Sequence, residues 1–231
     1  MADTLRAGPA RVVTVSERGP ADIAPHGTML RDAAGPLADL AAAAALPGAH
    51  NAQNAAAAAA MALHLGASRA AVAEGIRTYP GLAHRLERVA AKGKVQFVND
   101  SKATNADSTA RALVCYERII WIAGGQAKEG GIEPLAPFFP RIAEALLIGR
   151  DAPILAKTLA RHGVPHRTLG TLEAATAEAW RLARADGRDI VVLLSPACAS
   201  WDQFTGFDQR GDRFRTLAQA CVNEVGGEVG A

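Results

Sequence analysis

Short, continuously apolar runs alternate with amphipathic stretches along residues 82–224, and this alternation predicts a fold of the α/β class. Continuous apolar runs are typical of parallel strands that are covered on both faces. Strands and helices that alternate with short links form a doubly wound, mostly parallel sheet. The expected strands are 94–98, 119–123, 145–148, 165–169 and 189–194, and the expected helices are 105–114, 133–142 with proline interruptions, 151–161, 172–185 and 209–222. A run at 86–89 precedes the first of these strands and predicts a hairpin with it.

The first 81 residues follow a less regular pattern. Apolar runs at 11–16 and 27–32 predict two short strands between Gly- and Pro-rich turns, with no evident sheet for them to join. An alanine-rich stretch at 50–65 and a second stretch at 69–77 predict helices. The breaker Tyr79-Pro80-Gly81 marks the predicted domain boundary, so we expect one domain over 1–81, a second over 82–224 and a short tail over 225–231.

The charge and cysteine content exclude several classes of protein. The chain has 25 Lys and Arg against 23 Asp and Glu. A net charge of +2 is too small to indicate binding to nucleic acid or a polybasic contact with a membrane. The chain has no apolar run of membrane-spanning length and no signal peptide at its start. The cysteines at 115, 198 and 221 are few and widely spaced, which favours reduced thiols over disulfides or a zinc site. We therefore predict a cytoplasmic protein without a metal centre of its own.

Candidate chemistry follows the carboxyl ends of three predicted strands, in the segments 99–105, 124–131 and 195–207. In parallel sheets ligands collect at this edge, so we expect the three segments to converge there. Strand-to-helix junctions also expose backbone N–H groups that suit anions. No G-x-x-x-x-G-K-[ST] and no G-x-G-x-x-G after a strand occurs, which argues against a triphosphate-binding loop and a dinucleotide domain within this sequence.

Charged and hydroxyl side chains in these segments could form a binding site for a small dicarboxylic acid, because lysine ammonium groups make strong charge-assisted bonds to carboxylates. The candidates are Lys102, Thr104, Lys128 and Ser200, and Asp100 belongs to the same polar cluster. Each also has a plainer interpretation, such as a helix cap, a turn residue or a solvated lysine. Arg85 could contact a ligand or merely cover a hinge, and Asn54 could have a hydrogen-bonding task or simply be exposed.

Two further features near the C-terminus have alternative interpretations. Cys198 has apolar neighbours and no base nearby in sequence, which favours a buried hydrophobic role over a nucleophile. The charged segment 208–214 is either a solvated helix start or a brace for the Ser200 loop through Arg–Asp pairs.

Six strings occur in an order that is familiar from one enzyme family. They are His-Asn-Ala-Gln-Asn-Ala at 50–55, Gly-Leu-Ala-His-Arg at 81–85, Asn-Asp-Ser-Lys-Ala-Thr-Asn at 99–105, Gly-Gly at 124–125 with Lys128, Leu-Ser-Pro-Ala-Cys-Ala-Ser at 194–200, and Arg-Gly-Asp-Arg-Phe at 210–214. The chain resembles the Mur ligase family over about residues 48–222. The strings at 99–105 and 194–200 together point to its D-glutamate-adding branch.

The resemblance implies a Rossmann-like C-terminal ligase domain, preceded by the end of a central ATPase domain. Family members place ATP contacts at the positions of Asn54, Arg85 and Asp100. They place D-glutamate contacts at the positions of Lys102, Thr104, Lys128, Ser200, Trp201 and Phe207, and the two lysines would serve in catalysis. Trp201 departs from the smaller apolar residue expected there, and Ala83 replaces the usual proline.

The activity implied by the resemblance is ATP- and Mg²⁺-dependent ligation of D-glutamate to UDP-N-acetylmuramoyl-L-alanine in peptidoglycan precursor synthesis. We expect a monomer. The family's P-loop, metal ligands and UDP-binding domain have no match here, so we expect a truncated chain that does not turn over ATP alone. The alternative is a non-catalytic module that binds an acidic amino acid or a nucleotide.

Overall fold

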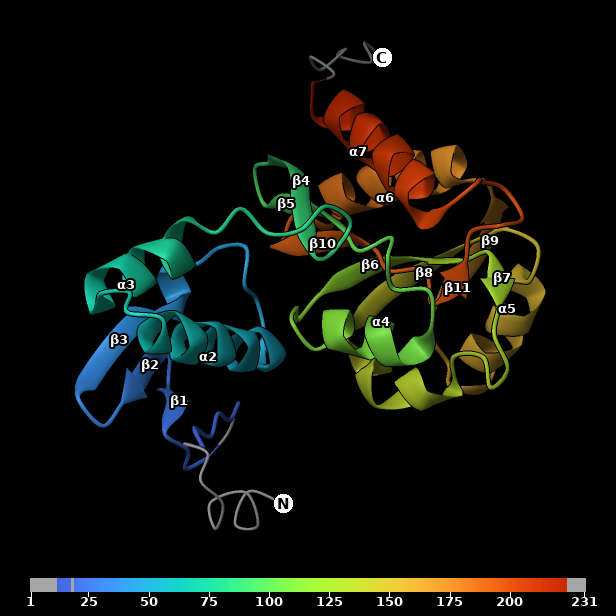
Figure 1. The fold of residues 1–231 in the computed structure, drawn as a ribbon. Coiled ribbons are helices and arrows are strands. Elements are labelled where there is room, and N and C mark those ends of the chain that lie inside the picture. Colours follow the sequence, from blue (N-terminus) through green and yellow to red (C-terminus); the bar gives the residue numbers. More distant parts are fainter. Residues whose placement is uncertain (1–11, 18, 224–231) are drawn as a thin grey trace. The chain divides into compact units, whose positions relative to one another are not determined.

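The computed structural model describes residues 12–17 and 19–223, so the predicted tail at 225–231 lies outside the described residues. The chain forms two compact units, Met1–Gly81 and Leu82–Ala231 (Figure 1).

The N-terminal unit packs two helices against a three-stranded antiparallel sheet. The strands are β1 (Ile23–His26), β2 (Met29–Asp32) and β3 (Gly35–Asp39), followed by a short 3-10 turn, η1 (Leu40–Ala42). The helices are α2 (Ala49–His64) and α3 (Arg69–Thr78), as the alanine-rich pattern predicted. Buried apolar side chains of the three strands and both helices form the core of the unit.

One predicted strand in this unit is wrong. In the described part of 11–16, residues 12–16, the chain makes only an isolated bridge between Val15 and Ile23. The carboxylate of Asp22 accepts the Thr14 N–H at 2.7 Å and the Thr14 hydroxyl at 2.7 Å, so a side chain takes the place of a ladder partner. The prediction of a strand near 27–32 is confirmed as β2, but β1 and β3, which begins Gly-Pro, were missed.

The C-terminal unit is a six-stranded sheet in the order β4-β5-β10-β6-β8-β9. Four of the five neighbouring pairs are parallel, and only the hairpin of β4 and β5 is antiparallel, which confirms the predicted fold class. The strands are β4 (Glu87–Lys92), β5 (Val95–Asn99), β6 (Ile119–Gly124), β8 (Ile142–Ile148), β9 (His166–Gly170) and β10 (Ile190–Leu194).

Helices cover both faces of this sheet, as Figure 1 shows. On one face α4 (Ala106–Leu113), the 3-10 segment η2 (Glu133–Arg141) and α5 (Ala152–Arg161) pack on a core around Trp121. On the other face α6 (Leu172–Asp186) and α7 (Phe207–Asn223) pack on a core around Phe97. The segment predicted as a proline-interrupted helix is 3-10 in form, because Pro137 and Pro140 cannot donate the bonds an α-helix needs.

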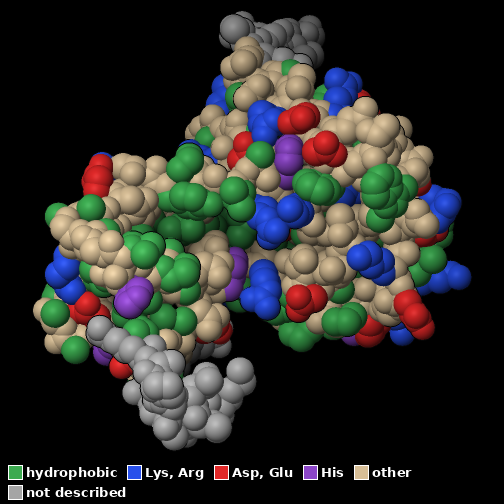
Figure 2. Space-filling view, viewed as in Figure 1, with side chains coloured by type: hydrophobic (Ala, Val, Ile, Leu, Met, Phe, Trp, Pro, Cys, Tyr) green, Lys and Arg blue, Asp and Glu red, His purple; other side chains and the backbone are tan. Residues whose placement is uncertain are grey.

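The surface of the C-terminal unit carries lysine, arginine and acidic side chains interspersed with polar and apolar ones on the face that Figure 2 shows. None of the helices among residues 12–17 and 19–223 is long and apolar enough to cross a lipid bilayer.

Candidate functional site

Three loops that leave the carboxyl ends of β5, β6 and β10 meet at one edge of the sheet. The Ala197 N–H donates to the Ala103 carbonyl at 3.0 Å, and the Gly124 N–H donates to the Pro196 carbonyl at 2.9 Å. Two-residue strands β7 (Gln126–Ala127) and β11 (Cys198–Ala199) pair antiparallel between the second and third loops. The predicted convergence of the three loops is confirmed.

Gly124 and Gly125 permit the second loop to lie against its neighbours. Both have a positive φ, 124° and 127°. A Cβ atom on Gly124 would stand 2.0 Å from the Ile148 carbonyl oxygen, and one on Gly125 would stand 2.2 Å from that of Ala199. Side chains are therefore excluded at both positions by backbone on either side.

Asp100 begins the first loop and is buried, with 7% of its surface exposed. Its Oδ2 accepts from the Ser195 hydroxyl at 2.7 Å, and its Oδ1 accepts from the Leu86 N–H at 3.3 Å. Burial raises the pKa of this carboxyl to about 7, against the opposing effects of those two hydrogen bonds and of the Arg85 charge. The carboxyl links the first loop to the third loop and to the segment that enters β4.

Lys102 is exposed, and its ammonium lies 5.1 Å from the centroid of the Phe207 ring. This is a cation–π contact between the first loop and the start of α7. The Lys102 N–H donates to the His84 carbonyl at 3.1 Å, and the Phe207 ring meets the His84 ring edge-on at 6.0 Å. Two of the predicted site residues are thus brought together directly, both supported by His84.

The other predicted residues lie on the converging loops with different exposure. Thr104 is half-buried, Lys128 is exposed and Ser200 is buried. Trp201 is 68% exposed, so its ring makes little contact within the chain. The loops of these residues are joined through backbone hydrogen bonds and not through the four side chains.

Two residues that the resemblance assigns to ATP are also exposed. Arg85 follows the buried His84 in the segment that enters β4. Asn54 belongs to the N-terminal unit, on α2, where its amide donates to the Asn51 side-chain oxygen at 3.3 Å.

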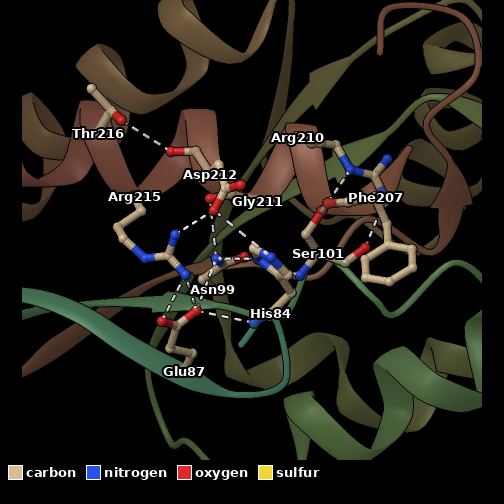
Figure 3. A network of polar contacts seen from close by, with 10 residues as sticks. All are labelled: His84, Glu87, Asn99, Ser101, Phe207, Arg210, Gly211, Asp212, Arg215 and Thr216. Atoms are coloured by element: carbon tan, nitrogen blue, oxygen red, sulfur yellow. Dashed lines mark hydrogen bonds and ion pairs between the residues drawn. The ribbon is translucent and has the colours of Figure 1, made fainter. Parts of the chain in front are cut away.

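A polar network that the sequence did not reveal surrounds His84 (Figure 3). The Asn99 amide lies 3.1 Å from His84 Nδ1 and also donates to the Gly211 carbonyl at 3.1 Å. Glu87 accepts from the His84 N–H at 3.0 Å and from Arg215 at 2.8 Å. The other ring nitrogen, Nε2, lies 3.8 Å from the Asp212 carboxylate.

Gly211 makes room for this histidine. A Cβ at position 211 would stand 2.2 Å from His84 Nδ1, so only glycine leaves space for the ring against α7. The segment before β4 is therefore fixed to the C-terminal unit through a side chain inserted at a glycine in a helix.

Strained backbone is concentrated at this edge. Among the described residues, the non-glycine residues with positive φ are His84 at 63°, Leu86 at 47° and Ala197 at 57°. Such a conformation costs roughly 1–2 kcal/mol per residue and persists where surrounding contacts enforce it. Here the Leu86 and Ala197 N–H groups both donate to the first loop.

Arg210, near the start of α7, joins the first and third loops. Its Nε donates to the Ser101 hydroxyl at 3.0 Å, and its Nη2 donates to the Ser101 carbonyl at 2.9 Å. Both Nη atoms also donate to the Cys198 carbonyl at 3.2 Å. The charged segment at 208–214 does brace the third loop, but the predicted Arg–Asp pairing is wrong, because Arg210 uses carbonyl and hydroxyl oxygens instead.

Cys198 is buried as predicted, and burial raises the pKa of its thiol to about 12. A thiol of this kind is not a nucleophile at neutral pH. Among the described residues, no group of three His, Cys, Asp or Glu side chains could hold a metal ion.

Sequence reasoning missed His84, Asn99, Ser101, Ser195 and Arg210 as parts of this site. One signal was available: Asn99 and Ser195 are polar residues at the immediate ends of apolar strands, where parallel sheets place their sites. His84 and Arg210 belong to the family strings at 81–85 and 210–214, but no local pattern indicated the partners that they find 15 and 109 residues away.

Much of the chain is similar to proteins of one family. Residues 84–198 match the family described as "Mur ligase, glutamate ligase domain". The UDP-N-acetylmuramoylalanine–D-glutamate ligase of Nitrobacter hamburgensis is 50% identical over 226 residues, which are 95% of this chain and 48% of that protein. The enzyme of the same name from Nitrobacter winogradskyi is 55% identical over 185 residues, 80% of this chain and 40% of that protein. The chain thus spans about half the length of the curated relatives it matches.

Two solved structures share the fold at low sequence identity. The UDP-N-acetylmuramate–alanine ligase of Thermotoga maritima aligns with a TM-score of 0.64 at 16% identity, over 90% of this chain and 48% of that one. MurF from Acinetobacter baumannii aligns with a TM-score of 0.59 at 19% identity, over 91% of this chain and 47% of that one.

Proposed function

Residues 84–198 belong to the Mur ligase family, in its glutamate ligase domain, and from this we propose that the chain serves in ATP-dependent ligation of D-glutamate to UDP-N-acetylmuramoyl-L-alanine. The reaction forms an amide bond in peptidoglycan precursor synthesis. The observation that carries the proposal is the convergence of the three loops at one edge of the sheet, each of which bears residues suited to an acidic amino acid.

In this proposal the C-terminal unit binds D-glutamate. Lys102 and Lys128 supply positive charge for its two carboxylates, and Thr104 and Ser200 supply hydroxyl groups. Phe207 holds the Lys102 ammonium by the cation–π contact, and Trp201, which directly follows Ser200, lies beside the bound acid. Gripping both carboxylates would leave the amine of D-glutamate oriented toward the acyl group it attacks, so positioning contributes most of what these residues do.

We assign ATP contacts to Arg85, Asp100 and Asn54 by the match with family positions. An exposed guanidinium and a carboxyl that keeps unused lone pairs are chemically suited to a nucleotide. Among the described residues, no cluster of three His, Cys, Asp or Glu side chains could hold Mg²⁺ by itself. We further propose that 1–81 is the end of the central ATP-binding domain, that 82–224 is the amino-acid-binding domain with 225–231 as its tail, and that the whole protein is a cytoplasmic monomer.

Calorimetry on the chain with D-glutamate, L-glutamate and ATP tests the substrate assignment. We expect D-glutamate to bind and L-glutamate to bind much more weakly, and we expect no ATP turnover because the sequence has no G-x-x-x-x-G-K-[ST]. Tight binding of L-glutamate, or of ATP without D-glutamate, would favour the non-catalytic module. Phosphate release by this polypeptide alone, dependent on both substrates, would contradict the expected inactivity.

Matched lysine variants make the test specific. Lys102→Ala and Lys128→Ala each remove a charge-assisted bond of about 1.5–3 kcal/mol, so D-glutamate affinity should fall by roughly 10- to 100-fold. Lys157→Ala removes an exposed lysine from α5 and should leave the affinity unchanged. Near-normal D-glutamate affinity in both site variants would exclude the proposed binding of its carboxylates by Lys102 and Lys128.

A further inference from the structure

Arg210 is a buried cation without a buried counter-ion. Only 1% of its surface is exposed, and within the described chain it forms no ion pair with a carboxylate. Burying a charge is costly unless every polar group around it is satisfied. Burial accordingly lowers the pKa of this guanidinium to about 10, against the weaker opposing effects of Cys198 and Asp202. A protein keeps such a group only where its contacts are needed.

The contacts of Arg210 reach all three loops of the candidate site. Two nitrogens bind the hydroxyl and the carbonyl of Ser101 in the first loop, as Figure 3 shows in part, and two bind the Cys198 carbonyl in the third loop. In the second loop a Cβ on Gly125 would stand 3.4 Å from Nη1, so the guanidinium also lies against that backbone.

These contacts are next to the residues proposed to bind D-glutamate. Ser101 directly precedes Lys102, and Cys198 is two residues before Ser200. The Ser101 hydroxyl, which accepts from Arg210, also donates to the Phe207 carbonyl at 2.7 Å. A shift of the guanidinium would therefore move the backbone beside three of the proposed ligand-binding residues.

We propose that Arg210 is the positioning residue that holds the three loops in the arrangement that binds the dicarboxylate. The proposal rests on the proposed function for the identity of the ligand, but not for the loop contacts themselves. The planar guanidinium, with five donors, can reach both loops at once, which a lysine or a neutral side chain cannot do. Its charge, which makes no ion pair with a carboxylate within the described chain, also favours an anion at this edge.

The variants Arg210→Met, Arg210→Lys and Ser101→Ala test the proposal in the whole chain. Arg210→Met removes the charge and every donor, and D-glutamate affinity should fall at least about tenfold. Lysine is similar in size to methionine but can still donate to one carbonyl. Arg210→Lys should therefore bind D-glutamate at least about threefold more tightly than Arg210→Met. Ser101→Ala is a small change that removes one partner, and it keeps the test open should Arg210→Met fold poorly; its affinity should fall about threefold or more.

Hydrogen exchange in the free chain provides a measurement that needs no ligand. In Arg210→Met the amides of Gly124 and Ala197, which bond between loops, should exchange at least about tenfold faster, while amides of β4 and α5 stay protected. Arg213→Met is the matched control, because Arg213 lies on the same helix and pairs with Glu173 at the surface. It should leave both affinity and exchange unchanged.

Three results would overturn the proposal: unchanged D-glutamate affinity in Arg210→Met, equal affinity in the Met and Lys variants, or faster exchange spread evenly over the unit. The last two would show that Arg210 acts only through packing or global stability. If the unchanged chain fails to bind D-glutamate, the proposed function is wrong. The exchange comparison then still decides whether Arg210 holds the loops.

Discussion

Substitution of Gly211 by alanine tests the insertion of His84 against α7. In an exposed helix this change stabilises by about 1 kcal/mol, because alanine has the higher helix propensity. At position 211 the new Cβ would stand 2.2 Å from His84 Nδ1. The ring must withdraw by more than about 1 Å to reach an ordinary contact distance of about 3.5 Å.

The magnitude follows from the contacts that the ring would lose. Overpacking of a filled site costs about 1–3 kcal/mol, and loss of the 3.1 Å hydrogen bond with Asn99 costs about 1 kcal/mol more. Against the helix gain of about 1 kcal/mol, the C-terminal unit should be destabilised by roughly 1–3 kcal/mol. The affinity for D-glutamate should fall as well, because the His84 carbonyl holds the Lys102 N–H.

Denaturant unfolding followed by tryptophan fluorescence is a suitable assay, because Trp121, Trp180 and Trp201 all belong to this unit. In a His84→Gly background, which removes the ring and suits the positive φ at that position, Gly211→Ala should instead stabilise by about 1 kcal/mol. Gly75→Ala in α3, where a Cβ would meet nothing within 4 Å, should stabilise the N-terminal unit, as followed by hydrogen exchange of α3. Two results would refute the clash between the methyl group added at position 211 and the His84 ring. One is that Gly211→Ala stabilises the otherwise unchanged chain, and the other is that Gly211→Ala still destabilises the chain in the His84→Gly background.

Other consequences can be measured separately. Because burial raises the pKa of Asp100 to about 7 in the folded state, the folded chain binds more protons than the unfolded chain between about pH 4 and 7. The free energy of unfolding of the C-terminal unit should therefore fall as pH rises from 5 to 7, by up to about 1.4 kcal/mol per pH unit from this group, and Asp100→Asn should flatten that dependence; equal slopes would contradict it. Iodoacetamide followed by mass spectrometry should label Cys198 last of the three cysteines, and early labelling of Cys198 would argue against its burial. Gly125→Ala, whose Cβ would overlap the Ala199 carbonyl, should destabilise the unit by about 3 kcal/mol and weaken D-glutamate binding, whereas a stable variant with normal affinity would show that the second loop adapts.

The fold of the C-terminal unit could be predicted because its strands are continuous apolar runs and its helices begin and end at ordinary signals. Asn105, for example, caps α4 by accepting from the Ser108 N–H at 2.8 Å. The segment at 11–16 has the apolar pattern of a strand, but pattern alone does not show whether a partner strand is available. The contact that decides the outcome is the hydrogen bond from the Thr14 N–H to the Asp22 carboxylate. Local sequence indicates the preference for helix or strand, but it does not show which distant group forms a hydrogen bond with a given backbone N–H or C=O.

The same limit applies to the candidate site. Lys102, Thr104, Lys128 and Ser200 were suggested by their place after apolar strands, and their loops do meet. Arg210 lies among charged neighbours in a segment typical of a solvated helix start, yet it is buried. Its partners are separated from it by 109 and 12 residues, so only the folded chain brings them together.

The short pairing of β7 with β11 fastens two of the loops by main-chain atoms only. Main-chain rungs do not depend on which side chains they carry, apart from proline. Substitutions at nearby positions such as 128 and 201 therefore leave this pairing intact. Evolution can change which acid the site binds by replacing those side chains, without altering the loop backbone.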